Sequence, residues 1–204
     1  MKKNISCPCG GNIQFDYDEE IDLDVKPQTL EDISKGTFMS YKCPSCGKKH
    51  KPEYRIILNW KSKNYRLLVI PELERGDFYL KKKENINFET VIGFPEMADR
   101  LSVIKDGLEP VVIETLKAFI HAKAEENYPD NDINVWYYCC GPSGIEFHLD
   151  GIRRGEIAVM IIPNEMYEKT LNEYKKHPKA NNYAALRVRS YLSIQNLLRP
   201  DVLK

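Results

Sequence analysis

The sequence has no excess of charge and no long apolar run. Its 30 lysines and arginines balance its 30 aspartates and glutamates, whereas a nucleic-acid-binding domain is usually basic overall. Its longest apolar stretches, such as Ile157–Ile162, span about six residues, far short of the roughly 20 that a transmembrane helix needs. The composition therefore predicts a protein with no membrane partner, and it removes the simplest argument for a nucleic-acid partner.

The sequence also lacks a secretory signal, because Lys2 and Lys3 are followed by no apolar run. We therefore expect a cytoplasmic protein. In that compartment thiols stay reduced, and close cysteine pairs bind metal more often than they bind each other. Four of the six cysteines stand in two such pairs, which favours metal over disulfides.

A third absence is that of a catalytic motif. The acidic run Asp16–Asp24 does not have the spacing of a calcium loop, and Gly141–Gly144 is a turn rather than a phosphate loop or a nucleophile elbow. His121 lies in an expected helix and His148 in an expected strand, and we interpret both as structural or exposed residues. The sequence therefore predicts no enzyme and no catalytic residue.

The chemically specific feature is two cysteine pairs, in Cys7–Gly10 (Cys-Pro-Cys-Gly) and Cys43–Gly47 (Cys-Pro-Ser-Cys-Gly). Proline fixes one φ inside each tight turn, and the glycine behind it permits a positive φ while backbone N–H groups turn toward the sulfurs. Four thiolates on two such knuckles form a closed tetrahedral shell, which suits structural Zn²⁺ and leaves no open position for catalysis. The predicted zinc ligands are Cys7, Cys9, Cys43 and Cys46.

The first knuckle is one residue shorter than the second. One residue separates Cys7 from Cys9, whereas two separate Cys43 from Cys46. A one-residue spacer places two sulfurs on one metal only through a tighter turn. His50, four residues beyond Cys46, is the substitute ligand if a cysteine of the first pair does not bind.

Alternating apolar residues predict strands on both sides of the knuckles, as a zinc ribbon requires. The expected strands comprise residues 12–17, 21–25, 37–42, 53–60 and 65–70. Residues 29–36 are predicted to form a short helix, with Thr29 as its N-cap and Gly36 at its end. Residues 71–94, which include Lys81–Lys83, are expected to connect this region to the next.

The second half of the chain predicts an α+β domain. Its expected helices comprise residues 95–105, 110–127, 164–176 (capped by Asn164) and about 184–198, where 186–189 are the alternative strand. Three strands at 134–140, 144–149 and 156–162, joined by turns, predict an antiparallel meander. The predicted fold class is α+β: an N-terminal zinc-ribbon β domain (1–70), a connecting segment (71–94) and an α+β domain with an antiparallel sheet (95–204).

Around its cysteines the sequence resembles the CpXC family of bacterial and archaeal proteins, which is named for two Cys-Pro-x-Cys motifs. The missing residue between Pro8 and Cys9 departs from that motif. The resemblance implies a zinc-binding N-terminal domain and implies no activity. It depends on Ile5–Gly10, Lys35–Phe38, Tyr41–Gly47, Lys51–Tyr54 and Leu68–Glu72, and more loosely on Met97–Leu116.

Charge is unevenly distributed along the chain. Acidic residues predominate between Asn12 and Lys35, and basic residues predominate between Lys42 and Lys83. The basic strands could bind nucleic acid through phosphate contacts and stacking. We favour the simpler interpretation that the acidic arm pairs with the basic arm. The basic and aromatic residues concerned are Tyr54, Arg55, Trp60, Lys61, Lys63, Tyr65 and Arg66.

Cys139 and Cys140 end an expected strand, and we interpret them as small core residues, with a vicinal disulfide or redox pair as the alternative. An enzyme centred on them and His148 would rest on residue types alone. The expected function is a non-enzymatic cytoplasmic protein, in which a structural zinc ribbon is part of an interaction or adaptor module with another protein as partner. The alternative is a nucleic-acid-associated zinc-ribbon protein that uses the basic face of residues 42–83.

Overall fold

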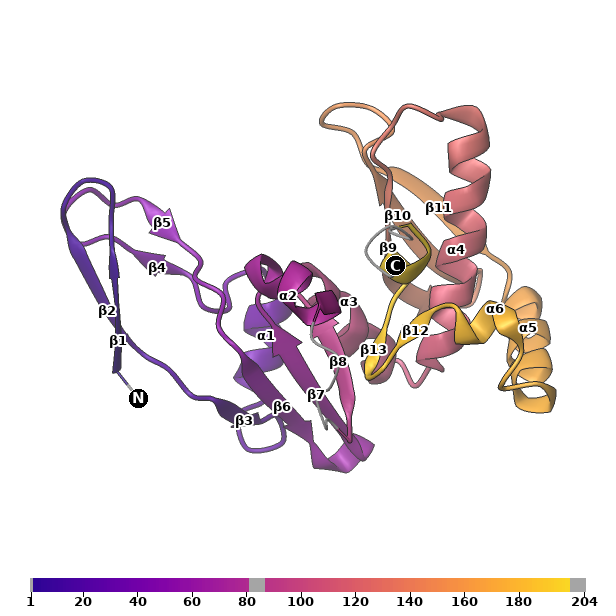
Figure 1. Ribbon diagram of the computed structural model, residues 1–204, viewed down its shortest axis with the longest axis horizontal. Helices are drawn as coiled ribbons and strands as arrows, with labels where there is room; N and C mark the ends of the chain where they lie inside the picture. The colour runs from indigo at the N-terminus through magenta and orange to yellow at the C-terminus, as the bar shows by residue number, and fades with distance from the viewer. Residues whose placement is uncertain (1, 81–86, 199–204) are drawn as a thin grey trace. The chain divides into compact units, whose positions relative to one another are not determined.

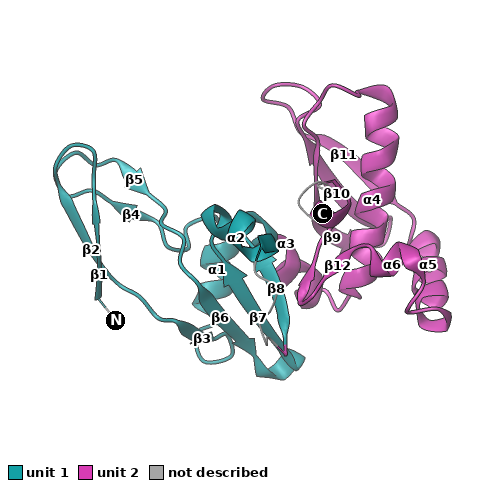
Figure 2. Ribbon diagram, in the orientation of Figure 1, with its two compact units in different colours: residues 1–81, 88–98 teal, residues 82–87, 99–204 magenta. Residues whose placement is uncertain are grey.

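The computed structural model describes residues 2–80 and 87–198. The chain forms two compact units, the first made of residues 1–81 and 88–98 and the second of residues 82–87 and 99–204 (Figure 2). The division falls within helix α3 (Phe94–Lys105), after Ala98. The three-part division into residues 1–70, 71–94 and 95–204 stays a prediction.

Two antiparallel hairpins of the first unit carry the cysteine turns (Figure 1). They are β1 (Lys2–Ser6) with β2 (Asn12–Asp16), and β4 (Tyr41–Lys42) with β5 (Lys49–His50). Ile13 and Phe15 are buried on one face of β2, as the predicted alternation requires. The expected strand 37–42 is shortened to β4, because residues 37–40 form a turn in which the Ser40 N–H donates to the Thr37 carbonyl.

The first unit also contains a mixed sheet. Its strands β3 (Glu20–Asp22), β6 (Ile56–Trp60), β7 (Tyr65–Ile70) and β8 (Glu89–Ile92) lie in the order β8-β7-β6-β3. The predicted hairpin is confirmed, since β6 and β7 are antiparallel and joined by η1 (Lys61–Lys63) and by Asn64 at φ 50°. The pairings of β3 with β6 and of β7 with β8 are parallel, which local alternation did not indicate.

The short predicted helix is confirmed as α1 (Gln28–Ser34), but its predicted N-cap is wrong. The helix begins one residue earlier, after Pro27, and no side chain caps its first N–H groups. Thr29 is instead buried within the first turn. Gly36 has φ +68° just beyond the helix end, so the predicted glycine stop is confirmed.

The predicted connecting segment contains regular structure. It holds η2 (Glu72–Glu74), α2 (Arg75–Leu80) and β8. Phe78 of α2 is 1% exposed, and the buried Arg75 guanidinium donates to the carboxylates of Glu72 and Glu96 and to the Ile92 carbonyl. These contacts join α2 to the sheet. Lys81–Lys83 lie outside the described residues.

The predicted antiparallel meander is confirmed in the second unit. Its strands β9 (Asn134–Gly141), β10 (Gly144–Asp150) and β11 (Ala158–Ile162) lie in the order β11-β10-β9. Ile145, Phe147 and Leu149 alternate toward the core, where they pack with apolar residues of α4 (Pro110–Asn127) such as Leu116 and Ile120. Helix α5 (Asn164–Lys176) adds Tyr167 to the same core.

The predicted cap of α5 is wrong, and the predicted final helix is replaced by shorter elements. Pro163 occupies the N-cap position, and the Asn164 side chain instead donates to the Gly141 carbonyl. The tail forms α6 (Asn181–Ala184), β12 (Arg187–Val188), β13 (Tyr191–Leu192) and α7 (Gln195–Leu198). The alternative strand at residues 186–189 therefore agrees with β12, which pairs with β13 in a hairpin.

Helix α4 buries two charged side chains, Glu114 and Lys117, each 3% exposed. They pair with each other and with Arg100 and Asp99 of α3. Within residues 2–80 and 87–198, no helix is long and apolar enough to cross a membrane.

Candidate metal centre

The first cysteine turn is closed by its own backbone. The Cys7 N–H donates to the Gly11 carbonyl at 2.8 Å, and the Gly10 N–H donates to the Cys7 carbonyl at 2.9 Å. Gly10 has φ +86°, in the region that glycine enters without steric cost. The turn therefore brings the Cys7 and Cys9 side chains to the end of the β1–β2 hairpin despite its single intervening residue.

The second turn repeats this construction. The Cys43 N–H donates to the Lys48 carbonyl and the Gly47 N–H donates to the Cys43 carbonyl, both at 2.9 Å. Gly47 has φ +72°. The predicted role of the glycine behind each cysteine pair is confirmed by these positive φ values.

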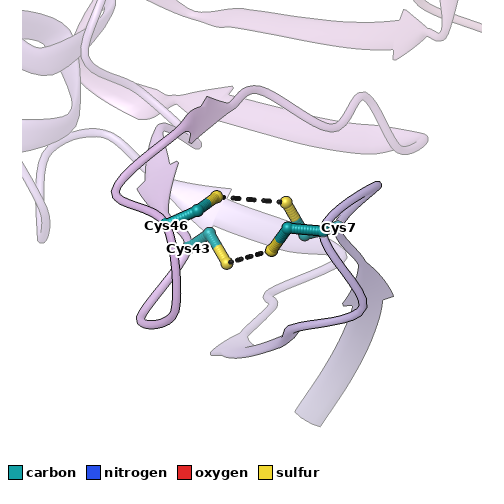
Figure 3. A group of neighbouring side chains, drawn as sticks. Cys7, Cys43 and Cys46 are labelled. Atoms are coloured by element: carbon teal, nitrogen blue, oxygen red, sulfur yellow. Dashed lines mark hydrogen bonds between the residues drawn. The ribbon is translucent and has the colours of Figure 1, made fainter.

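The two turns bring the four cysteine sulfurs together. The Sγ of Cys7 lies 3.6 Å from that of Cys46, and the Sγ of Cys9 lies 3.6 Å from that of Cys43. All four sulfurs lie within 4.8 Å of one another. Figure 3 shows the two turns facing each other, with one dashed line between Cys7 and Cys46 and a second between the first turn and Cys43. Sulfurs of a tetrahedral shell with bonds of about 2.3 Å would be about 3.8 Å apart, so the four cysteines could hold a metal ion.

His50 lies beside this cluster and is not a member of it. Its Nε2 is 3.2 Å from the Cys7 Sγ, a hydrogen-bonding distance for nitrogen and sulfur. The short first knuckle therefore places both of its sulfurs with the second pair, and the substitution of His50 for a cysteine stays a prediction.

The thiols of the cluster ionise unequally. Hydrogen bonds from the backbone N–H of Cys46, and less strongly from that of Ser45, lower the pKa of the Cys43 thiol to about 6 against the effect of burial. The backbone N–H of Cys9 likewise favours the Cys7 thiolate, but burial and hydrogen bonding with the neighbouring thiols raise the pKa of Cys7 to about 12. The Cys43 thiolate therefore forms readily. Only a bound cation would offset the repulsion among four thiolates.

Aromatic stacking and one glycine fix the distance between the two hairpins. The rings of Phe15 and Tyr41 are stacked at 4.2 Å, with an interplanar angle of 22°. A Cβ atom at Gly11 would lie 2.8 Å from both the Cys43 Sγ and the Ser45 Oγ, so only glycine lets the turns approach this closely. Sequence reasoning missed Gly11, although the Gly10-Gly11 dipeptide beside a knuckle was an available signal.

The acidic and basic arms of the first unit pair with each other. Lys61 Nζ lies 2.7 Å from an Asp22 carboxylate oxygen, and an Arg66 guanidinium nitrogen lies 3.4 Å from Glu20. The favoured interpretation of the charge distribution therefore agrees with the structure at these positions. The carboxylate of Asp24 accepts hydrogen bonds from Ser62, so these acidic residues already have partners.

Other residues considered as nucleic-acid contacts also interact with side chains of the protein itself. Arg55 forms an ion pair with Glu74 at 2.7 Å, and the Tyr65 hydroxyl donates to Glu89. Trp60 is 7% exposed. Lys63 lies over the Trp60 ring, 5.9 Å from its centroid. The ring of Tyr54 packs 5.0 Å from that of Tyr17.

The prediction that Cys139 and Cys140 are core residues is wrong. Both thiols are free, Cys139 is half-buried and Cys140 is exposed, whereas Val135 and Tyr137 earlier in β9 are buried. Burial, and then the Glu146 carboxylate, raise the pKa of Cys139, which disfavours a reactive thiolate.

The two histidines expected to be structural or exposed occupy different surroundings. His148 stacks on the exposed Tyr138, with ring centroids 4.0 Å apart, and its Nε2 lies 2.8 Å from Glu146. His121 is buried on α4, with Nδ1 3.8 Å from Glu125. Neither His121 nor His148 belongs to the group of possible metal ligands found among the described residues.

Comparison with known proteins agrees with the cysteine geometry. Residues 5–117, more than half of the chain, match the family described as "CpXC protein". A protein of Treponema pallidum (strain Nichols), described as "Uncharacterized protein", is 29% identical over 214 residues, covering 95% of this chain and 97% of the relative. No solved structure matches the chain significantly. The matched region contains both cysteine turns, and this chain therefore belongs to the CpXC family.

Proposed function

We propose that this protein binds one Zn²⁺ through Cys7, Cys9, Cys43 and Cys46. The observation that carries the proposal is the group of four sulfurs within 4.8 Å of one another, supplied by two facing turns. Four thiolates in a tetrahedral arrangement suit zinc or iron. The group contains no carboxylate ligand, which a harder metal would prefer.

The zinc has a structural role in this proposal. The hairpins that carry the ligands have strands of only five and two residues, and such short strands are marginally stable in isolation. A structural zinc site supplies on the order of 10 kcal/mol of folding free energy in small zinc domains. Four protein ligands leave the metal no position for substrate or water, so the site supports a non-enzymatic role.

The protein acts, in this proposal, as part of a cytoplasmic interaction or adaptor module with a protein partner. One face of the β9–β10–β11 sheet supports such a role, since it exposes Tyr138 (58%), Val159 (57%) and Ile161 (48%). Exposed apolar side chains that cluster on one face are typical of protein contacts. The nucleic-acid alternative has less support, because Lys61 and Arg66 already face carboxylates.

Metal analysis of the full chain tests the zinc site. We expect about one zinc per chain in the purified protein and little visible absorption, which an iron–sulfur cluster would produce. Cys46→Ser removes one ligand and is expected to abolish stoichiometric zinc binding. Cys140→Ser is the matched control, since Cys140 is an exposed free thiol outside the cluster, and it should keep the metal. A metal-free wild-type protein with a protected N-terminal unit would contradict the proposal.

Co-purification from the native cell tests the interaction role. Tagged wild-type chain should retain a stoichiometric protein partner after nuclease treatment, and Val159→Glu should lose it because a charge is placed on the exposed apolar face. Lys169→Glu, a change at an exposed position of α5, is the control. Retention of nucleic acid rather than protein would favour the alternative function.

A further inference from the structure

The second unit contains a cavity that the metal centre does not involve. Its volume is about 350 Å³, and it lies where α4, α5, α6 and the β12–β13 hairpin supply side chains. The side chains that carry the argument are Val111, Tyr174, Lys179, Tyr183, Arg187 and Arg189. All of them belong to residues 99–204, so the cavity is formed within one unit.

The cavity is strongly basic in a chain whose net charge is zero. Lys179, Arg187 and Arg189 line it, and no acidic residue does so among the described part of the chain. Within residues 2–80 and 87–198, neither Lys179 nor Arg187 forms an ion pair. In the first unit, by contrast, Lys61 and Arg66 face the carboxylates of Asp22 and Glu20. Two cations without an ion pair, with Arg189 beside them in the lining, attract an anion.

The remaining wall of the cavity is apolar and aromatic. Tyr183 is 7% exposed, and its ring meets that of Tyr174 edge-on, with centroids 5.1 Å apart and an interplanar angle of 77°. Val111 of α4, 4% exposed, packs with Tyr183 in the small core cluster beneath. These side chains are held by packing, so they present a preformed surface that suits a flat apolar group.

Arg189 is held in a conformation that arginine seldom adopts. It lies between β12 and β13 with φ 56°, in the left-handed region, where residues other than glycine, asparagine and aspartate are uncommon. A two-residue hairpin loop, such as the one between Val188 and Tyr191, favours a positive φ at its first position, so the turn itself accounts for this conformation. Here the tight hairpin brings Arg187 and Arg189 to the same cavity.

We propose that this cavity binds a small molecule that carries a phosphate group on an aromatic or other flat ring. The guanidinium groups of Arg187 and Arg189 match phosphate oxygens through paired N–H donors, and the Lys179 ammonium adds a third charge. The ring of the ligand packs against Tyr174 and Tyr183. The site is independent of the proposed zinc, because none of its lining residues belongs to the unit that contains the cysteines.

Titration of the full chain with three probes tests both parts of this assignment. Phenyl phosphate is expected to give saturable shifts of the Tyr174 and Tyr183 ring signals in NMR spectra. Inorganic phosphate should bind the same site several-fold more weakly, and phenol should not saturate it. Equal affinity for inorganic phosphate would overturn the ring requirement. The absence of saturable shifts with phenyl phosphate would overturn the proposal as a whole.

Variants that remove one positive charge distinguish a specific binding site from a general attraction of anions. Arg187→Gln and Lys179→Gln are each expected to weaken phenyl phosphate binding about tenfold, as loss of one charge-assisted hydrogen bond does. Both positions are exposed, so the variants should fold, which circular dichroism checks. Arg154→Gln and Lys169→Gln are the matched controls, since both residues are exposed and lie outside the cavity. Equal weakening by variants and controls would show non-specific attraction and overturn the proposal.

Discussion

At the scale of single residues, Gly11 sets how closely the two cysteine turns approach. A Cβ atom there would lie 2.8 Å from the Cys43 Sγ, so Gly11→Ala must displace the Cys43 sulfur or the turn that carries it. We expect a loss of zinc affinity of about tenfold or more, since displacing one ligand by a few tenths of an ångström strains the tetrahedral shell. Competition with a chelator measures this change.

The control for Gly11→Ala is Gly76→Ala. Gly76 lies in α2, and a Cβ atom there would meet nothing within 4 Å. The control should leave zinc affinity unchanged, and it should be neutral or slightly stabilising because alanine favours a helix more than glycine does. If the two variants bound zinc equally well, the spacing argument for Gly11 would be wrong.

His50 provides a second residue-scale prediction. Because its Nε2 contacts the Cys7 sulfur and all four cysteines are already together, His50→Ala should keep one zinc per chain. The affinity should fall roughly tenfold, as is typical when a hydrogen-bonding partner of a metal ligand is removed. Zinc stoichiometry and chelator competition measure the two quantities separately. Loss of stoichiometric zinc would instead identify His50 as a ligand.

At the scale of elements, buried charges connect the helices of the second unit to its strands. Lys117 Nζ lies 2.9 Å from Glu114 and also pairs with Asp99. Asp99 in turn accepts the Tyr137 N–H of β9, and Glu114 accepts the Ile194 N–H. The network therefore specifies how α3, α4, β9 and the C-terminal segment pack, because each group loses its partner if one element shifts.

Removing one member of this network should be costly. Lys117→Ala leaves two buried carboxylates without their shared cation, and we expect it to lower the free energy of unfolding by about 3 kcal/mol or more. Lys123→Ala is the control on the same helix, since Lys123 is exposed and lies over the Phe119 ring, and it should cost less than about 1 kcal/mol. Urea denaturation followed by circular dichroism compares them, and similar costs would contradict a stabilising network.

At the scale of the whole molecule, the proposed metal stabilises one unit and the apolar core of α4 and β9–β11 stabilises the other. Chelation of zinc should therefore raise amide hydrogen exchange in residues 2–16 and 41–50, while residues 110–176 stay protected by their own core. Hydrogen exchange with mass spectrometry resolves these segments. Uniform loss of protection along the chain would show that the units unfold together.

Much of this fold follows from local patterns. The alternation of Ile145, Phe147 and Leu149 predicts β10, and the glycines after each cysteine pair predict turns with positive φ, which the structure confirms. The segment 71–94 was less informative, because its sequence mixes charged and apolar residues. The buried Arg75 donates to Glu72, three residues away, and also to Ile92 and Glu96, 17 and 21 residues along the chain. No local pattern reveals the two distant contacts.

The sequence by itself determined which cysteines would come together and which segments would form most of the helices and strands. Cysteine spacing and hydrophobic periodicity are properties of neighbouring residues, so they can be recognised without knowledge of the fold. Only the tertiary structure decided the parallel pairing of β3 with β6, the exposure of Cys140 and the basic cavity around Arg187. Each of these depends on residues far apart in the chain, whose approach is set by packing of the whole unit rather than by local preference.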